Sequence, residues 1–260
     1  MNAEAPADPP RSVGLAGSPN FRDAGGYRSA DGGQLRWRRL FRSGHLAALE
    51  DADHEPLAQL DLQLVVDLRR DDERAHEPSA LPDGTPVMAA PINPGSQANA
   101  LLGEGGSIDS GEAMFDFMCA INRQFVETQS DAFAAVFAEL LDSGAERLLV
   151  HCSAGKDRTG FLVAMLQVAL GVPRRDVYAD YLLSGRHYLP ERELPRARRK
   201  YRVSHLADAQ LLPLLRVDTA YLRAAFDAID DGYGGCDAYL ERGLGLDAAA
   251  RRELRRRFHG

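Results

Sequence analysis

Short apolar runs alternate along the chain with longer segments in which apolar residues recur every three or four positions. The runs "LQLVVDLR" (62–69), "TPVMAAPI" (85–92) and "RLLVHC" (147–152) are typical of buried strands. Between the last two, residues 111–142 have the apolar spacing of amphipathic helices. This alternation predicts an α/β domain with a central, mostly parallel sheet and helices on both faces.

Polar residues and glycines indicate where further elements begin and end. Residues 18–45 are predicted to be extended segments around a tight turn at 31–33, because Asp-Gly-Gly tolerates positive φ. Helices are expected at 51–60, from the segment after Cys152 to about 171, and at 174–185. Side chains suited to cap helices are Ser130, Asp218 and Asp247.

The chain is predicted to form one domain over 18–260, preceded by a flexible, polar, proline-rich tail at 1–17. The Gly- and Ser-rich segment 94–110 is predicted to be a mobile loop. There is no apolar run of about 18 residues, and the start lacks the basic and apolar regions of a signal peptide. The expected location is therefore the cytoplasm, with secretion by a route without a signal peptide left open.

The composition of the chain argues against several classes of ligand and bound group. With 31 basic and 38 acidic residues the net charge is −7, which argues against nucleic-acid binding. Three widely spaced cysteines do not suggest a disulfide framework or a metal cluster. We therefore expect neither a metal nor another cofactor.

One basic segment stands out in this acidic chain. "RHYLPERELPRARRKYR" (186–202) has seven basic residues and two acidic ones. We interpret 186–205 as a helical lid over a pocket, which would steer acidic substrates or make peripheral contact with anionic lipid. The alternative is the solvated face of an ordinary helix.

The segment "HCSAGKDRTG" (151–160) places one cysteine between a predicted strand and a predicted helix. A short loop that opens a helix directs backbone N–H groups, and the positive end of the helix dipole, at an anion. Gly155 lets the loop turn tightly, Gly160 permits close packing of the helix, and the planar guanidinium of Arg158 fits two oxygens of a tetrahedral dianion. The pattern predicts an anion-binding loop.

A thiol in that loop would be stabilised as a thiolate, which makes Cys152 a candidate nucleophile for phosphoryl transfer. Thr159 would donate a hydrogen bond to the sulfur, and His151 would support the loop from behind. Arg158 and the N–H groups would neutralise the phosphoryl oxygens without a metal. The alternative is that Cys152 is a small buried apolar residue.

"HCSAGKDRTG" matches the Cys-x5-Arg loop of the protein tyrosine phosphatase superfamily, and its Gly-Lys-Asp-Arg-Thr-Gly form resembles that of a bacterial atypical group with a secreted mycobacterial member. The segments "NFRDAGGY", "LFRSGHL", "VVDLRRDDE", "DVYADYLLS" and "YLRAAFDAIDDGYGG" resemble recurring segments of this group, so the likeness covers nearly the whole chain. The resemblance implies a phosphatase-type fold and hydrolysis of phosphotyrosine, with phosphoserine, phosphothreonine and phosphoinositides as further substrates. The resemblance further implies that the phosphate-binding positions of this group correspond to Ser153, Ala154, Gly155, Lys156, Asp157 and Arg158.

The leaving oxygen needs a proton, so a carboxylic acid is expected near the loop. Asp157 is the first candidate, and Asp67, at the end of a predicted strand, is the second. The alternatives are a structural Asp157 and a salt bridge from Asp67 to Arg69 or Arg22. Lys156 would hold a second phosphate or a carboxylate, or would simply be solvated.

Two arginines in apolar surroundings, Arg22 and Arg42, are expected to support the loop. Their predicted partners are Asp23, Asp67 and Asp157, and the alternative is direct contact with substrate.

The expected activity is phosphomonoester hydrolysis through a phosphocysteine on Cys152. The alternative within the same chemistry is a phosphoinositide or inositol-phosphate phosphatase with little activity on proteins, which would depend on Lys156 and on 186–202. A phosphate-binding module without activity is disfavoured because Cys152, Arg158 and Thr159 are all present. A sulfurtransferase or an arsenate reductase would also use a thiolate, but Cys119 and Cys236 are predicted to be core residues rather than redox partners. Oligomeric state is not indicated.

Overall fold

The computed structural model describes residues 11–93, 108–201 and 203–260. The strands are β1 (Arg22–Asp23), β2 (Leu40–Ser43), β3 (Leu64–Asp67), β4 (Val87–Ala89) and β5 (Leu148–His151). They form one sheet in the order β1-β2-β5-β3-β4, parallel except for β1, which is antiparallel to β2. β5 is therefore the central strand, and its carboxyl end lies in the middle of one sheet edge.

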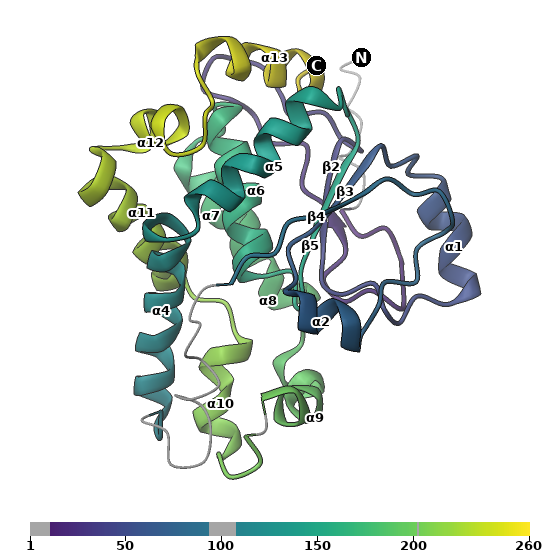
Figure 1. Ribbon diagram of the computed structural model, residues 1–260, viewed down its shortest axis with the longest axis vertical. Helices are drawn as coiled ribbons and strands as arrows, with labels where there is room; N and C mark the ends of the chain where they lie inside the picture. The colour runs from purple at the N-terminus through teal and green to yellow at the C-terminus, as the bar shows by residue number, and fades with distance from the viewer. Residues whose placement is uncertain (1–10, 94–107, 202) are drawn as a thin grey trace, which may run out of the picture.

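Helices cover both faces of this sheet. Figure 1 shows α1 on one side and α5, α6 and α7 on the other. The helices are α1 (Asp51–Ala58), α2 (Asp71–His76), α4 (Gly111–Glu127), α5 (Ser130–Asp142), α6 (Asp157–Ala169), α7 (Arg174–Leu182), α8 (Ser184–His187), α9 (Pro190–Tyr201), α10 (Asp208–Leu215), α11 (Thr219–Tyr233), α12 (Cys236–Arg242) and α13 (Ala248–Phe258).

The central strands bury side chains on both faces, which explains why their sequences are continuously apolar. Leu148 and Val150 of β5 pack in the larger hydrophobic cluster with α5 and α6, whereas Leu149 points into a second cluster with Leu57 of α1. Successive side chains of a strand alternate between faces, so an uninterrupted apolar run fits a sheet covered on both sides. The predicted α/β architecture is confirmed.

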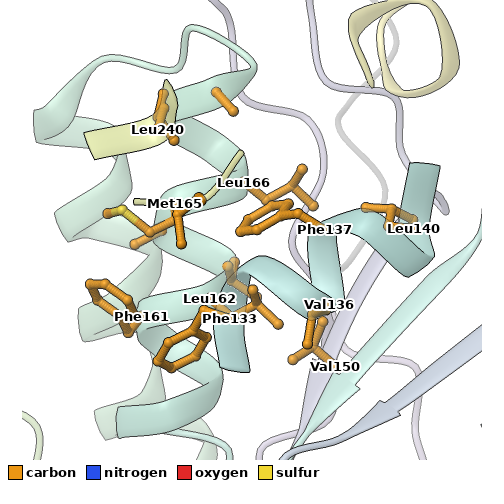
Figure 2. Packing of buried hydrophobic residues seen from close by; sticks show 14 of the residues in the cluster. Phe133, Val136, Phe137, Leu140, Val150, Phe161, Leu162, Met165, Leu166 and Leu240 are labelled. Carbon is orange, nitrogen blue, oxygen red and sulfur yellow. The ribbon is translucent and has the colours of Figure 1, made fainter. Parts of the chain in front are cut away.

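Aromatic rings fill the larger cluster between α5 and α6. Figure 2 shows Phe133 and Phe137 of α5 facing Phe161 and Leu166 of α6, with Val150 of β5 beneath them. The Phe133 and Phe161 ring centroids are 4.9 Å apart in an edge-on arrangement, which is favourable for aromatic pairs. This packing fixes α6, whose first residue follows the loop at 151–156.

Most predicted elements are confirmed, with informative exceptions. Asp218 and Asp247 cap their helices by accepting hydrogen bonds from Ala220 N and Ala250 N. Ser130 does not cap α5: the N-cap is Gln129, and the Ser130 hydroxyl donates to Val126 O instead. The charged helix α2 was not predicted, because its sequence "DDERAH" has no apolar face.

The folded part of the chain begins before residue 18. Ser12 forms a β-bridge with Arg22, Leu15 is buried, and Ala16 N donates to Asp53 Oδ1 at 2.8 Å. Residues 11–17 are therefore packed rather than a free tail. The rest of the predicted tail and residues 94–107 of the predicted loop lie outside the described residues.

Near the predicted turn, Arg28 and Gln34 form a single β-bridge and Gly32 has φ of +92°. The turn is as expected, but the strands beside it are shorter than predicted: β1 and β2 alone carry the sheet pairing over 18–45. No helix in the described ranges is long and apolar enough to cross a membrane.

Candidate active site

The segment at 151–156 follows the central strand and leads into α6. His151 ends β5, and Asp157 begins the helix. In a parallel sheet, ligands bind beyond the carboxyl ends of the strands. The candidate loop lies at this position, as the sequence indicated.

Buried donors hold the loop carbonyls inside the protein. Asn20 Nδ2 donates to Ala154 O at 3.0 Å and to Gly155 O at 2.8 Å. Arg42 Nη2 donates to Gly155 O at 2.9 Å. On the opposite side of the same peptide chain, Gly155 N lies 3.3 Å from Cys152 Sγ and donates to it. The loop is thus oriented with carbonyls inward and this amide toward the thiol.

Glycine is required at two positions here. Gly155 has φ of +68°, and a Cβ on it would lie 2.4 Å from the Ser43 carbonyl. A Cβ on Gly160 would lie 2.7 Å from the Tyr181 ring. The first glycine lets the loop pass close to β2, and the second lets α6 pack closely against α7.

Cys152 is 3% exposed, at the base of the loop. Burial alone would raise the pKa of its thiol. The Arg158 charge and nearby backbone N–H groups outweigh burial, so the pKa lies below that of an ordinary cysteine. The Thr159 hydroxyl is buried next to this loop without a hydrogen-bond partner among the residues that the structure describes, so the predicted bond from it to the sulfur is not formed. The arrangement therefore favours the thiolate, which is the nucleophilic form.

Arg158 is bound on one edge by a carboxylate. Its Nη1 donates to Glu73 Oε2 at 2.7 Å and to Leu68 O at 3.1 Å, and its Nη2 donates to Glu73 Oε1 at 3.1 Å. Burial would raise the pKa of Glu73, but Arg158 and Lys200 lower it strongly, so this carboxylate stays ionised. A guanidinium has five N–H donors, which leaves Nε–H and one Nη2–H for an anion.

Arg22 and Arg42 are fully buried and share one carboxylate. Arg42 Nη1 lies 2.6 Å from Asp180 Oδ2, and Arg22 Nε lies 3.9 Å from Asp180 Oδ1. Ser184 accepts a further hydrogen bond from Arg22 Nη2 at 3.1 Å. Burial and the nearby Arg42 charge lower the pKa of Arg22 to about 9, which leaves it protonated at neutral pH.

This corrects the predicted partners of the two arginines, which were Asp23, Asp67 and Asp157. The carboxylate that the sequence analysis missed is Asp180, within the motif "DVYADYLLS". Both arginines are fully buried and do not line the cavity above Cys152, so the structure favours the supporting role over direct contact with substrate. The sequence analysis also missed Asn20, in "NFRD". As with Asp180, its role depends on contacts with a distant segment of the chain.

Asp67 is bound behind the loop. Its Oδ2 lies 2.7 Å from Arg69 Nη2 and 3.5 Å from His151 Nε2. Burial would raise the pKa of Asp67, but hydrogen bonding and charge from Arg69 lower it. Burial also lowers the pKa of His151 to about 4, so His151 is neutral at pH 7. The salt bridge to Arg69 is thus the arrangement that the structure has.

Lys156 and Asp157 bind each other at the mouth of the loop. Lys156 Nζ lies 2.6 Å from Asp157 Oδ2, and Tyr181 OH lies 3.5 Å from Asp157 Oδ1. Lys156 is 3% exposed, which excludes a simply solvated lysine. Both side chains line the cavity above Cys152.

Helix α9, within the basic segment, lies against the loop. Lys200 Nζ donates to Ser153 Oγ at 2.5 Å and also forms an ion pair with Glu73. Arg196 Nη2 donates to Ser153 Oγ at 3.3 Å and forms an ion pair with Glu77. The segment is therefore not a free solvated face: α9 covers the site and is bound to α2.

The cavity enclosed by the loop and α9 has a volume of about 60 Å³. At about 10–15 Å³ per water molecule, this is room for roughly four to six waters. It suits a single tetrahedral anion, and it is much smaller than the pockets of about 300–1,000 Å³ that enclose drug-sized ligands. The residues that line it are Cys152, Ser153, Ala154, Lys156, Asp157, Arg158, Tyr188, Glu193, Arg196, Ala197, Lys200, Tyr201, Leu214 and Leu215.

The other two cysteines take no part in this site. Cys119 and Cys236 are free thiols that are half-buried against hydrophobic clusters, so they lie at the edge of the core rather than within it. Among the described residues, no group of three or more His, Cys, Asp or Glu side chains could hold a metal ion.

Known proteins similar to this chain are phosphatases by name. A protein of Cupriavidus necator, provisionally named a tyrosine-protein phosphatase, is 37% identical over 230 residues, which cover 88% of this chain and 83% of that protein. The triple specificity protein phosphatase PtpB of Mycobacterium tuberculosis is 32% identical over 275 residues, which cover 93% of this chain and 96% of PtpB.

Among solved structures, P. aeruginosa TpbA covers 68% of this chain and 85% of its own, with 21% identity and a TM-score of 0.34, too low to support a conclusion. The family match is much more extensive, because the model of the tyrosine phosphatase family matches residues 13–260. The chain belongs to the tyrosine phosphatase family.

Proposed function

We propose that this protein hydrolyses phosphotyrosine through a phosphocysteine intermediate on Cys152. The observation that carries the proposal is the position of this thiol. It lies under an anion-sized cavity, its pKa is lowered chiefly by Arg158 against the effect of burial, and it receives the Gly155 N–H at 3.3 Å. A phosphate in the cavity would place its phosphorus above the sulfur and its oxygens near Arg158.

The reaction has two steps, transfer of the phosphoryl group to Cys152 and hydrolysis of the phosphocysteine. The Cys152 thiolate attacks phosphorus, the bond to the phenolic oxygen breaks, and a carboxylic acid protonates the leaving oxygen. Water then attacks the phosphocysteine and gives a proton to the same carboxylate. The S–P bond breaks, and inorganic phosphate and the thiolate are released. Arg158 and the loop N–H groups stabilise the phosphoryl oxygens in both steps.

Two observations support a range of substrates wider than phosphotyrosine. The relative PtpB is named a triple specificity phosphatase. In this chain the cavity is lined by four cations, Lys156, Arg158, Arg196 and Lys200, which is more than one phosphate needs. The second candidate function is therefore hydrolysis of phosphoinositides, with Lys156 holding a neighbouring phosphate.

A panel of initial rates tests the two candidates against each other. The substrates are a phosphotyrosine peptide, a phosphoserine peptide and phosphoinositides with phosphate at different ring positions, each with the wild type and Lys156→Ala. Turnover of the phosphotyrosine peptide that is dominant and survives Lys156→Ala supports the tyrosine phosphatase. Lipid turnover that is dominant and falls at least tenfold in Lys156→Ala supports the second candidate. Arg192→Ala, on the exposed part of α9, is the control.

We also propose that α9 moves away when substrate enters, because the cavity of about 60 Å³ has no room for a phenyl ring. The contacts to break are the ion pairs of Lys200 with Glu73 and of Arg196 with Glu77, and both cations' bonds to Ser153. The pair of Arg196 with Glu77 is partly exposed to water, where such pairs contribute little to stability. Glu73 is buried, but it keeps Arg158 as a partner when Lys200 leaves, so opening does not strand its charge.

The double substitution Arg196→Ala/Lys200→Ala should speed alkylation of Cys152 by a bulky iodoacetamide at least severalfold, because the thiol is covered by α9. The measurement is labelling of the Cys152 peptide against time by mass spectrometry, with Cys119 as an internal reference. Arg192→Ala should label at the wild-type rate. Equal Cys152 labelling in the double variant and the wild type would show that these contacts do not keep the site closed.

A further inference from the structure

The carboxylates around the catalytic cavity differ in their partners. Asp67 is paired with Arg69, Glu73 with Arg158 and Lys200, and Asp157 with Lys156. A neighbouring cation favours the ionised form of a carboxylate. The pKa values of Asp67 and Glu73 are lowered, so these two groups are held in the form that has no proton to give, and Asp157 is engaged by the Lys156 ammonium.

Glu193 of α9 is the fourth carboxylate, and it differs from the other three because it is not paired with a cation in the described part of the chain. It lines the cavity together with Cys152, Asp157 and Arg158, although it comes from the helix above them. It also lines a second hollow of about 420 Å³, together with Arg192 of the same helix, which gives it a route to water. Within the described residues, no cation lies within ion-pair distance of Glu193.

The surroundings of Glu193 favour its protonated form. Burial raises the pKa of Glu193, and the charge of Glu77 acts in the same direction. The Arg196 charge and a hydrogen bond with Tyr188 oppose this shift without reversing it. A phosphate dianion entering the cavity adds negative charge nearby and so promotes protonation further.

We propose that Glu193 is the general acid that protonates the leaving oxygen, supplied by the lid helix as it packs back against the bound substrate after moving aside to admit the ring. This rests on the proposed phosphatase function. The proton passes from the Glu193 carboxyl to the phenolic oxygen as the P–O bond breaks. The resulting carboxylate then takes a proton from the water that attacks the phosphocysteine, which restores the acid.

The test compares Glu193→Gln on two substrates that differ in the leaving group. Tyrosine, with a pKa of about 10, is a poor leaving group that needs protonation. Turnover of a phosphotyrosine peptide should fall about 10²–10⁴-fold, the range for general acid catalysis. An aryl phosphate with a strongly acidic phenol should lose less than tenfold. The fall of kcat/KM at alkaline pH on the peptide should also disappear.

Two further variants separate catalysis from structure. Glu191→Gln, an exposed carboxylate on the same helix that does not line the cavity, should leave both rates unchanged. Glu193→Asp keeps an acid on a shorter side chain and should recover part of the phosphotyrosine rate. Inhibition by vanadate and the melting temperature show whether Glu193→Gln keeps the phosphate site and the fold.

Equal slowing of both substrates, or an unchanged phosphotyrosine rate, would overturn the role of Glu193. Asp157→Asn is the direct competitor: if it, rather than Glu193→Gln, shows the dependence on leaving group, the loop carboxylate is the acid. Failure of the proposed function gives a different result. In that case the wild type turns over neither substrate, or Cys152→Ser turns over both.

Discussion

Cys152→Ser should reduce turnover of every phosphomonoester by at least about 10⁴-fold, the scale of losing a catalytic nucleophile. The serine hydroxyl is not ionised where the thiol is, so Arg158 and the loop N–H groups have no anion to stabilise on that atom. Binding of a phosphate analogue should remain, because its ligands are the guanidinium and the backbone. Initial rates together with vanadate or phosphate titrations measure both quantities.

Cys119→Ser is the matched control, since it changes another free thiol away from the cavity. It should turn over substrate at the wild-type rate. Turnover by Cys152→Ser within tenfold of the wild type would rule out the phosphocysteine mechanism. Loss of both turnover and analogue binding would mean that the substitution disturbed the loop, and trapping of phosphocysteine in the wild type would then decide the mechanism.

Asp180→Ala should be the most destabilising single substitution near the site. Removing one partner of a buried ion pair typically costs about 3–5 kcal/mol, because the other charge is left uncompensated. Here two buried guanidiniums, Arg22 and Arg42, would lose their shared carboxylate. Urea unfolding monitored by circular dichroism measures the change in the free energy of unfolding.

Asp176→Ala is the comparison on the same helix. Asp176 pairs with the exposed Arg175 at 3.5 Å, and surface pairs contribute up to about 1 kcal/mol. If Asp180→Ala does not fold, Asp180→Asn retains the shape and tests the charge alone. A free energy of unfolding for the Asp180 variants no lower than that of Asp176→Ala would contradict the buried network.

The sequence predicted those parts of the site whose signals are local. The strand "RLLVHC", the glycines at 155 and 160, and the spacing from Cys152 to Arg158 are all contained within one short segment. The buried faces of the central strands were equally readable, because a sheet covered on both sides needs uninterrupted apolar runs.

The parts that the sequence did not predict depend on tertiary contacts. Asp180 lies 138 positions from Arg42, and nothing within "DVYADYLLS" indicates a buried anion rather than a solvated one. Glu73 belongs to a run of charges that reads as solvent-exposed, yet it binds Arg158, 85 positions away, and is buried. A charged residue's partner is set by the fold, so local pattern could not identify either carboxylate.

The cluster of Arg22, Arg42 and Asp180 contains one more positive charge than negative charge, and it lies directly behind the loop at 151–156. Within this cluster, one guanidinium charge has no carboxylate of its own. A phosphate bound at Cys152 would bring further negative charge to the other side of the loop. Ligands that bind only the folded state shift the unfolding equilibrium toward it. A phosphate bound there would thus also act as a counterion of the folded core, and its binding should raise the free energy of unfolding.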